Sequence, residues 1–190
     1  ERAVQELGKY RHGLKILNGG FTLSGGEPLM QDRFAVKLFT AAKSMGIHTC
    51  IETNGYLGER LSDDELDAID LVMLGLKTWG EDKHRELVGK DMAPTLQFAR
   101  RLAARRRPMW VRYVLVPGLT DGNETVKQIA KFAADLGNVQ RVEVLPFHQM
   151  GRFKWKALNL DYSLENVELP TPALVNSICD VFRAEGLKAV

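Results

Sequence analysis

Residues 21–28 read Phe21-Thr22-Leu23-Ser24-Gly25-Gly26-Glu27-Pro28, a short β-rich run that passes directly into a glycine turn. Adjacent glycines let the backbone approach a ligand closely, and they adopt dihedral angles that other residues avoid. Glu27 offers an acceptor for an ammonium group, and Pro28 fixes the end of the turn. Taken alone, the pattern is also typical of a tight turn between a strand and a helix.

Further β-rich runs follow at regular intervals, with helical patterns between them that stop at Gly46, Gly137 and Gly186. This alternation predicts an α/β fold with a parallel sheet. No repeat or linker divides the chain, so we expect one domain over residues 1–190, with about five βα units and a C-terminal helix. The predicted strands are Phe21 to Ser24, Ile47 to Glu52, Leu71 to Leu76, Met109 to Val116 and Arg141 to Phe147.

The overall composition excludes several classes of protein. Lys and Arg total 26 and Asp and Glu total 24 in 190 residues, a net charge of +2 that argues against a nucleic-acid-binding surface. No apolar run approaches the ~20 residues of a membrane span, and the first residues lack the apolar core of a signal peptide, so we expect a cytoplasmic protein with no membrane partner. The two cysteines, Cys50 and Cys179, are too few to hold a zinc ion or an iron–sulfur cluster by themselves.

Polar side chains follow each predicted strand where it ends. Because the carboxyl ends of parallel strands meet at one edge, these side chains are expected to converge there, as in β/α barrels. A solvated strand terminus explains any one of them, but five in succession favour a site. Two carboxylates, two cations and a histidine suit a small zwitterionic ligand. The residues are Ser24 and Glu27, Glu52, Lys77, Arg112 and His148.

These motifs resemble those of the radical S-adenosylmethionine (SAM) enzymes, and within them the glycyl-radical activating enzymes of the pyruvate formate-lyase type. The resemblance extends over essentially the whole chain. It implies a partial β/α barrel of the radical SAM type with its first βα unit missing or truncated. The segments that carry it are Ser24 to Pro28, Glu52-Thr53-Asn54-Gly55, Leu71 to Lys77, Val111 to Val114 with Val116-Pro117-Gly118, and Leu145 to His148 followed by Gly151.

The resemblance also implies an activity. A 4Fe–4S cluster chelates SAM, an electron cleaves the sulfonium, and the resulting 5′-deoxyadenosyl radical takes a hydrogen atom from a glycine of a glycyl-radical enzyme. A reduced flavodoxin or ferredoxin would donate the electron. Lys77, Arg112 and His148 are the implied catalytic residues, with roles that are interchangeable among them. The implied SAM-binding residues are Ser24, Gly25, Gly26, Glu27, Glu52, Asn54, Lys77, Arg112, Val114, Leu145 and His148.

Two departures from the family pattern limit these expectations. The chain has no Cys-x-x-x-Cys-x-x-Cys loop for the cluster, and Glu1 to Tyr10 resembles the helix that follows that loop. We therefore expect a SAM-binding core without cluster ligands, inactive by itself, and two buried structural thiols. Gly75 stands where the family has an acid, so a monovalent-cation site formed by Glu52, Thr53 and Met73 is expected to be weakened or absent.

Two alternatives to the enzyme remain open. In the first, the chain is a non-catalytic module that binds a glycyl-radical enzyme or an adenosyl ligand. In the second, it is an unrelated barrel enzyme that uses Glu27, Glu52 and His148 for acid/base chemistry. Arg105 to Arg107, with Arg100 and Arg101, is interpreted as a solvated helix end rather than a nucleic-acid patch. Gly151 to Lys156 mixes aromatic and basic residues, for which docking of the protein substrate or capping of the barrel is preferred over RNA stacking.

Overall fold

The computed structural model describes all 190 residues and contains one five-stranded sheet. Every neighbouring pair of strands is parallel, and the spatial order follows the sequence, β1-β2-β3-β4-β5. The predicted strands are confirmed to within two residues at each end. The strands are β1 (Gly20–Leu23), β2 (His48–Thr53), β3 (Leu71–Gly75), β4 (Met109–Leu115) and β5 (Val139–Pro146).

The helices connect successive strands. Their capping follows the sequence signals: Gly137 ends α6 in the left-handed conformation, and the Thr171 hydroxyl accepts a hydrogen bond at the start of α8. The α-helices are α1 (Arg2–Ile16), α2 (Asp32–Ser44), α3 (Asp63–Leu66), α4 (Glu81–Val88), α5 (Ala93–Ala104), α6 (Asn123–Leu136), α7 (Arg152–Ala157) and α8 (Pro172–Ala184). Short 3-10 turns, η1 (Pro28–Gln31), η2 (Gly58–Arg60) and η3 (Gln149–Gly151), lie between them.

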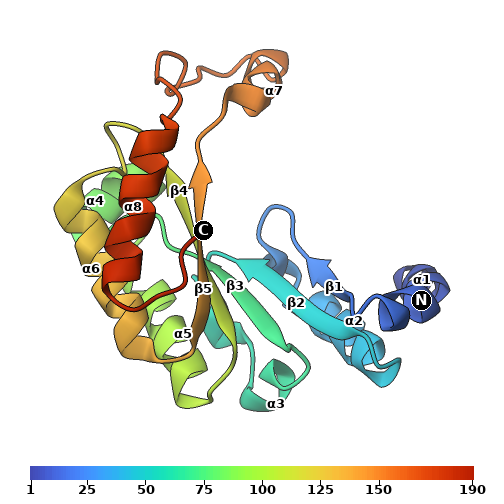
Figure 1. Cartoon of the computed structure of the whole chain (residues 1–190). Helices are drawn as coiled ribbons and strands as arrows, with labels where there is room; N and C mark the ends of the chain where they lie inside the picture. The colour runs from blue at the N-terminus through green and yellow to red at the C-terminus, as the bar shows by residue number, and fades with distance from the viewer.

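A strand order that never reverses places the connecting helices on one side of the sheet, as in a barrel that has not closed. Ile51, Val72, Leu74 and Tyr113 bury their side chains against these helices within a core cluster of 30 residues. Alternate positions such as Met73 and Arg112 are only half-buried on the opposite face. In Figure 1, α6 and α8 pack side by side near β4 and β5, whereas α1 and α2 lie together at the β1 end.

The C-terminal segments are placed differently from the rest. The chain end runs back beside β5, where Ala189 bridges to Val142. Helix α7, formed by part of the predicted aromatic and basic segment, stands apart from the sheet beyond the end of β5 (Figure 1). Its Trp155 packs against Tyr162, with 5.4 Å between the centres of the two rings, and Phe153 is exposed. No helix is both long enough and apolar enough to cross a membrane.

Candidate functional site

A cavity of about 380 Å³ lies at the carboxyl ends of the strands, and we call it the strand-end cavity. All five strands, or the loops that follow them, contribute to it. All the SAM-binding residues implied by the resemblance line it except His148. The lining residues are Ser24, Gly25, Gly26, Glu27, Glu52, Thr53, Asn54, Gly75, Lys77, Arg112, Val114 and Leu145.

The glycine turn presents bare backbone to this cavity. Gly25 and Gly26 have φ angles of +95° and +55°, values that side-chain-bearing residues rarely adopt. A Cβ built on either residue would meet no heavy atom within 4 Å. The glycines are therefore required by backbone conformation rather than by crowding, and the space beside them is free for a ligand.

Glu27 holds the glycine turn against the end of β2. Its Oε1 accepts hydrogen bonds from the Leu29 amide at 3.0 Å and the Thr53 hydroxyl at 2.7 Å, and its Oε2 accepts one from the Asn54 amide at 2.9 Å. A carboxylate has about four lone-pair sites, so little capacity remains for a ligand ammonium. The carboxylate expected to be a free acceptor acts largely as a clamp.

Arg112 links three strands across the open face of the sheet. Its guanidinium pairs with Glu52 on β2 and, at 3.2 Å, with Glu143 on β5, while the Ser24 hydroxyl donates to Glu52 at 2.7 Å. Glu143 was not predicted. It lies directly opposite Arg112 in the β4–β5 register and on the same face as Leu145, so the alternation of side chains along β5 contained the signal.

Lys77 differs from the other charged groups of the cavity because it has no hydrogen-bonded partner. Desolvation lowers its pKa, an effect that the negative charge of Glu52 opposes. Its Nζ lies above Gly75, 3.8 Å from where a Cβ at that position would be. An unpaired ammonium beside an open cavity is suited to binding an anionic group of a ligand.

His148 is not placed where we expected it. It lies beyond the end of β5 and its Nδ1 accepts a hydrogen bond from the Met150 amide at 3.3 Å, which caps η3. The chain turns into η3 directly after His148, and the imidazole is not among the residues that line the cavity.

The residues of the predicted cation site all have other contacts. Glu52 pairs with Arg112, and the Thr53 hydroxyl donates to Glu27 while accepting from the Gly55 amide at 3.0 Å. Met73 lies opposite Glu52 in the β2–β3 register, and its side chain offers a thioether, a soft donor that alkali cations disfavour, so only its backbone carbonyl could be a ligand. A weakened cation site remains a prediction.

The cysteines do not fit an iron–sulfur cluster. Cys50 on β2 and Cys179 on α8 are 5% and 2% exposed, and neither lines the strand-end cavity. Burial raises the pKa of both thiols, which disfavours the thiolate that a cluster requires. Two such thiols, on separate elements, do not make a three-thiolate site.

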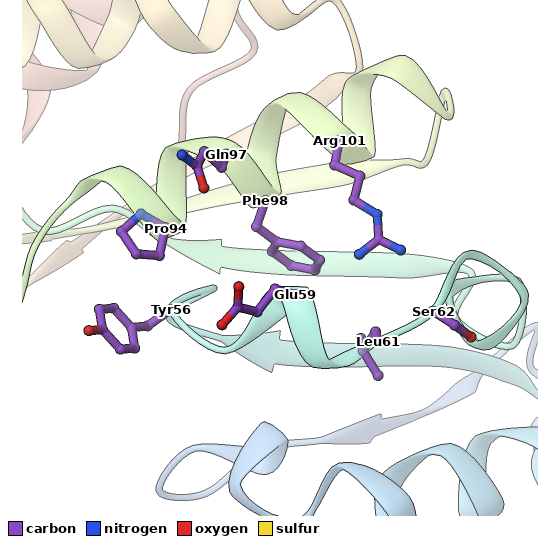
Figure 2. Close-up of a pocket in the computed structure, with 8 residues that line it drawn as sticks. All are labelled: Tyr56, Glu59, Leu61, Ser62, Pro94, Gln97, Phe98 and Arg101. Atoms are coloured by element: carbon purple, nitrogen blue, oxygen red, sulfur yellow. The ribbon is translucent and has the colours of Figure 1, made fainter.

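A different cavity, of about 400 Å³, lies between η2 and α5 (Figure 2). The Phe98 ring projects from α5 toward η2, and Arg101 extends from the same helix. The Arg101 guanidinium is already bonded to Asp63 and to the Gly58 carbonyl. This cavity contains none of the predicted binding residues, so the strand-end cavity is the better candidate.

Comparisons with known proteins agree with this geometry. The model of the radical SAM superfamily matches residues 1–133. The chain is 37% identical over 192 aligned residues to the pyruvate formate-lyase 1-activating enzyme of Escherichia coli (strain K12), covering 100% of this chain and 78% of that protein. It is 41% identical over 176 residues to the pyruvate formate-lyase-activating enzyme of Staphylococcus epidermidis, covering 90% of this chain and 70% of that protein.

A solved structure has the same fold. A domain of a pyruvate-formate lyase-activating enzyme from Bacteroides vulgatus superposes with a TM-score of 0.72 at 22% identity, covering 90% of this chain and 98% of that one. That match supports the parallel, partly closed barrel. From the sequence identities and the matching family model, the chain belongs to the radical SAM superfamily and, within it, to the pyruvate formate-lyase-activating enzymes.

Proposed function

We propose that this protein binds SAM in the strand-end cavity and serves in the activation of a glycyl-radical enzyme of the pyruvate formate-lyase type. The observation that carries the proposal is the convergence of Gly25, Gly26, Lys77 and Arg112 on one cavity in a chain with such relatives. A cavity of about 380 Å³ is in the size range of small-molecule sites.

The lining residues suggest a division of roles. The bare backbone of Gly25 and Gly26 would hold the methionine ammonium, with Glu27 fixing the turn and supplying its remaining lone pair. Lys77, which lacks a partner, would bind the carboxylate, and Arg112 would add positive charge. Ser24, Glu52 and Asn54 would form the rest of the polar wall, and Val114 and Leu145 would line the adenine pocket. His148 does not line the cavity, so it would contact the ribose only if SAM extends beyond the cavity toward η3.

Bound SAM would supply, when one electron cleaves its sulfonium C–S bond and releases methionine, a 5′-deoxyadenosyl radical that takes a hydrogen atom from a glycine of the partner. The residues of this chain would orient the sulfonium and exclude water from the reacting atoms. The cluster implied by the family is not held by Cys50 and Cys179, so no step is assigned to cluster ligands in these residues. A flavodoxin or ferredoxin donor and a cytoplasmic location are also part of the proposal.

The acid/base alternative is less well supported by the geometry. Glu27 is occupied by three donors and Glu52 is paired with Arg112, so neither carboxylate is free to take a proton from a substrate. His148, the third group of that alternative, lies outside the cavity.

SAM binding by isothermal titration calorimetry tests the proposal. Lys77→Ala should weaken binding about tenfold, the loss expected for one charge-assisted contact. Lys37→Ala, an exposed lysine on α2, is the matched control and should bind as the wild type does. Absence of SAM binding to the wild type, or equal affinity in both variants, would contradict the site.

Reconstitution with iron and sulfide under anaerobic conditions tests the ligand argument separately. The 190-residue chain should not retain a stoichiometric 4Fe–4S cluster or cleave SAM. A cluster that is reducible and cleaves SAM would show that the two cysteines have been misjudged. Binding of SAM without cleavage by a reconstituted chain carrying a complete cluster would instead favour the non-catalytic module.

A further inference from the structure

A second cavity of about 380 Å³, which we call the outer cavity, adjoins the strand-end cavity. The two share Glu27, Asn54, Gly75 and Lys77 as a common wall. The outer cavity opens away from the sheet, toward η1, the loop after β2 and helix α4. The residues that line the outer cavity but not the strand-end cavity are Met30, Tyr56, Leu57, His84, Val88, Lys90 and Thr95.

The loop that carries Lys90 is held in place by α4. Gly89 ends this helix in the left-handed conformation, with φ of +72°. The buried His84 donates from Nδ1 to the Lys90 carbonyl at 2.7 Å, because a carbonyl can only accept. Arg85 bonds Asp91 at 2.6 Å, and Glu81 accepts from the Met92 amide at 3.1 Å. Three successive residues are thus fixed, and Lys90 is preorganised beside the cavity.

The charges of the outer cavity are unbalanced in favour of cations. Lys77 and Lys90 each lack a salt bridge to an acidic side chain, and the Lys90 Nζ lies 6.0 Å from the centre of the Tyr56 ring. Glu27 is the only acidic residue in the lining, and its oxygens are occupied by the three donors described above. With Lys77 assigned to the carboxylate of SAM, Lys90 is the cation that remains for a second ligand, and a carboxylate would pair with it.

The entrance of the cavity is apolar. Met30 is 66% exposed and Val88 is 41% exposed, and Tyr56 and Leu57 are half-buried between the cavity and the core. Apolar side chains around a cationic centre suit an acidic residue with an apolar neighbour, as found in a polypeptide, better than a free inorganic anion.

We propose that the outer cavity binds an acidic side chain, with an adjacent apolar residue, of the glycyl-radical protein that this chain acts on. The proposal rests on the proposed function, since it assumes a polypeptide substrate. Its contact with the strand-end cavity through Gly75 and Lys77 would place the bound segment next to the reacting atoms. Lys90 would then contribute to recognition of the protein without touching SAM.

The first test uses a small probe of the same chemistry. Methyl NMR signals of Met30 and Val88 are followed during titration with 4-methylpentanoate and with 4-methylpentan-1-ol, its uncharged match. The carboxylate should bind about fivefold more tightly than the alcohol, and Lys90→Glu should remove this preference. Lys37→Glu, which makes the same charge reversal on α2, should retain it. Equal binding of the two probes, or a preference that survives Lys90→Glu, would overturn the proposal.

The second test uses E. coli pyruvate formate-lyase as the protein partner, with affinity measured by biolayer interferometry. Lys90→Glu should weaken binding about tenfold and Lys90→Gln less, whereas Lys37→Glu stays within about twofold of the wild type. Thermal unfolding establishes that each variant folds, and SAM affinity should be unchanged in all of them.

The outcomes separate this inference from the function on which it rests. Lys90-dependent binding of the carboxylate probe, with protein binding indifferent to Lys90, would identify a small anion as the occupant and overturn the polypeptide. If the wild type does not bind SAM but still binds the protein partner in a way that depends on Lys90, the proposed function is contradicted and the role of Lys90 is not. No binding of the protein partner to the wild type would overturn both.

Discussion

The two ends of the five-stranded sheet differ in whether their cationic side chains have acidic partners. Near the amino ends of β3 and β4, ion pairs join the end of α5 and the residues after it to α3 and the residue that follows α3. The pairs connect Arg101, Arg105 and Arg107 with Asp63 and Asp67. At the carboxyl ends, Lys77 and Lys90 have no acidic partner.

This contrast explains what each end does. The arginine-rich stretch lies at a helix end, as the sequence indicated, but Arg101, Arg105 and Arg107 form internal ion pairs, and only Arg100 and Arg106 are left exposed without one. Paired charges contribute to stability, whereas cations left unpaired at a cavity can be neutralised by a ligand. We therefore expect substitutions at the amino ends to change stability alone and substitutions at the carboxyl ends to change binding.

Glu27 should produce the largest effect, because three hydrogen-bond donors at the carboxyl ends of the strands depend on its carboxylate. Glu27→Ala leaves three donors without an acceptor and should lower the free energy of unfolding by about 2–3 kcal/mol. It should also abolish SAM binding, since the glycine turn loses its anchor. Urea unfolding and calorimetry measure the two effects. Glu27→Gln retains an acceptor for two of the three donors and should lose less, and a Glu27→Ala variant as stable as the wild type would refute the clamp.

Lys77 should show the opposite behaviour. Lys77→Met should weaken SAM binding about tenfold. The melting temperature should not fall, because the ammonium is exposed and has no partner, and desolvation lowers its pKa rather than raising it. A variant that loses SAM affinity and stability together would show that Lys77 is structural.

The sequence allowed much of this site to be predicted, for physical reasons that particular residues illustrate. Glu52 and Arg112 follow from the two-residue alternation within strands and from the common edge of parallel strands. Lys77 and His148 each lie two residues beyond the end of a strand, and only Lys77 lines the cavity, because His148 leads into η3 and caps it.

Long-range pairing is the part that local patterns do not encode. The Glu27 clamp depends on how closely the turn after β1 approaches the end of β2. Thr53 and Asn54, which donate to Glu27, follow it by 26 and 27 positions in the sequence. The pairs between Arg105 or Arg107 and Asp67 likewise join helices that are distant in sequence. Residue type predicted the charges, but only packing determined which of them are satisfied.

The amino end should respond in stability alone. Asp67→Ala removes the partner of Arg107 and one of the two partners of Arg105, and should lower the free energy of unfolding by about 1 kcal/mol, the value of a partly exposed ion-pair network. SAM affinity should not change, since no residue of this network lines the strand-end cavity. A change in affinity comparable to that of Lys77→Met would remove the distinction between the two ends.

Asp70, also at the amino end, should show the smallest effect and a pH dependence. Burial raises its pKa, but hydrogen bonds from Lys43 at 2.7 Å and from Thr49 outweigh burial and lower the pKa below its usual value. A lowered carboxyl pKa gives stability that is fully present above about pH 4–5 and is lost as the pH falls through the folded-state value. The Asp70–Lys43 coupling from a double-mutant cycle with Asp70→Asn and Lys43→Met should therefore be below about 1 kcal/mol at pH 7 and disappear near pH 2. A coupling that persists in acid would mean that Lys43 and Asp70 interact mainly through a hydrogen bond to the neutral carboxyl group rather than through charge.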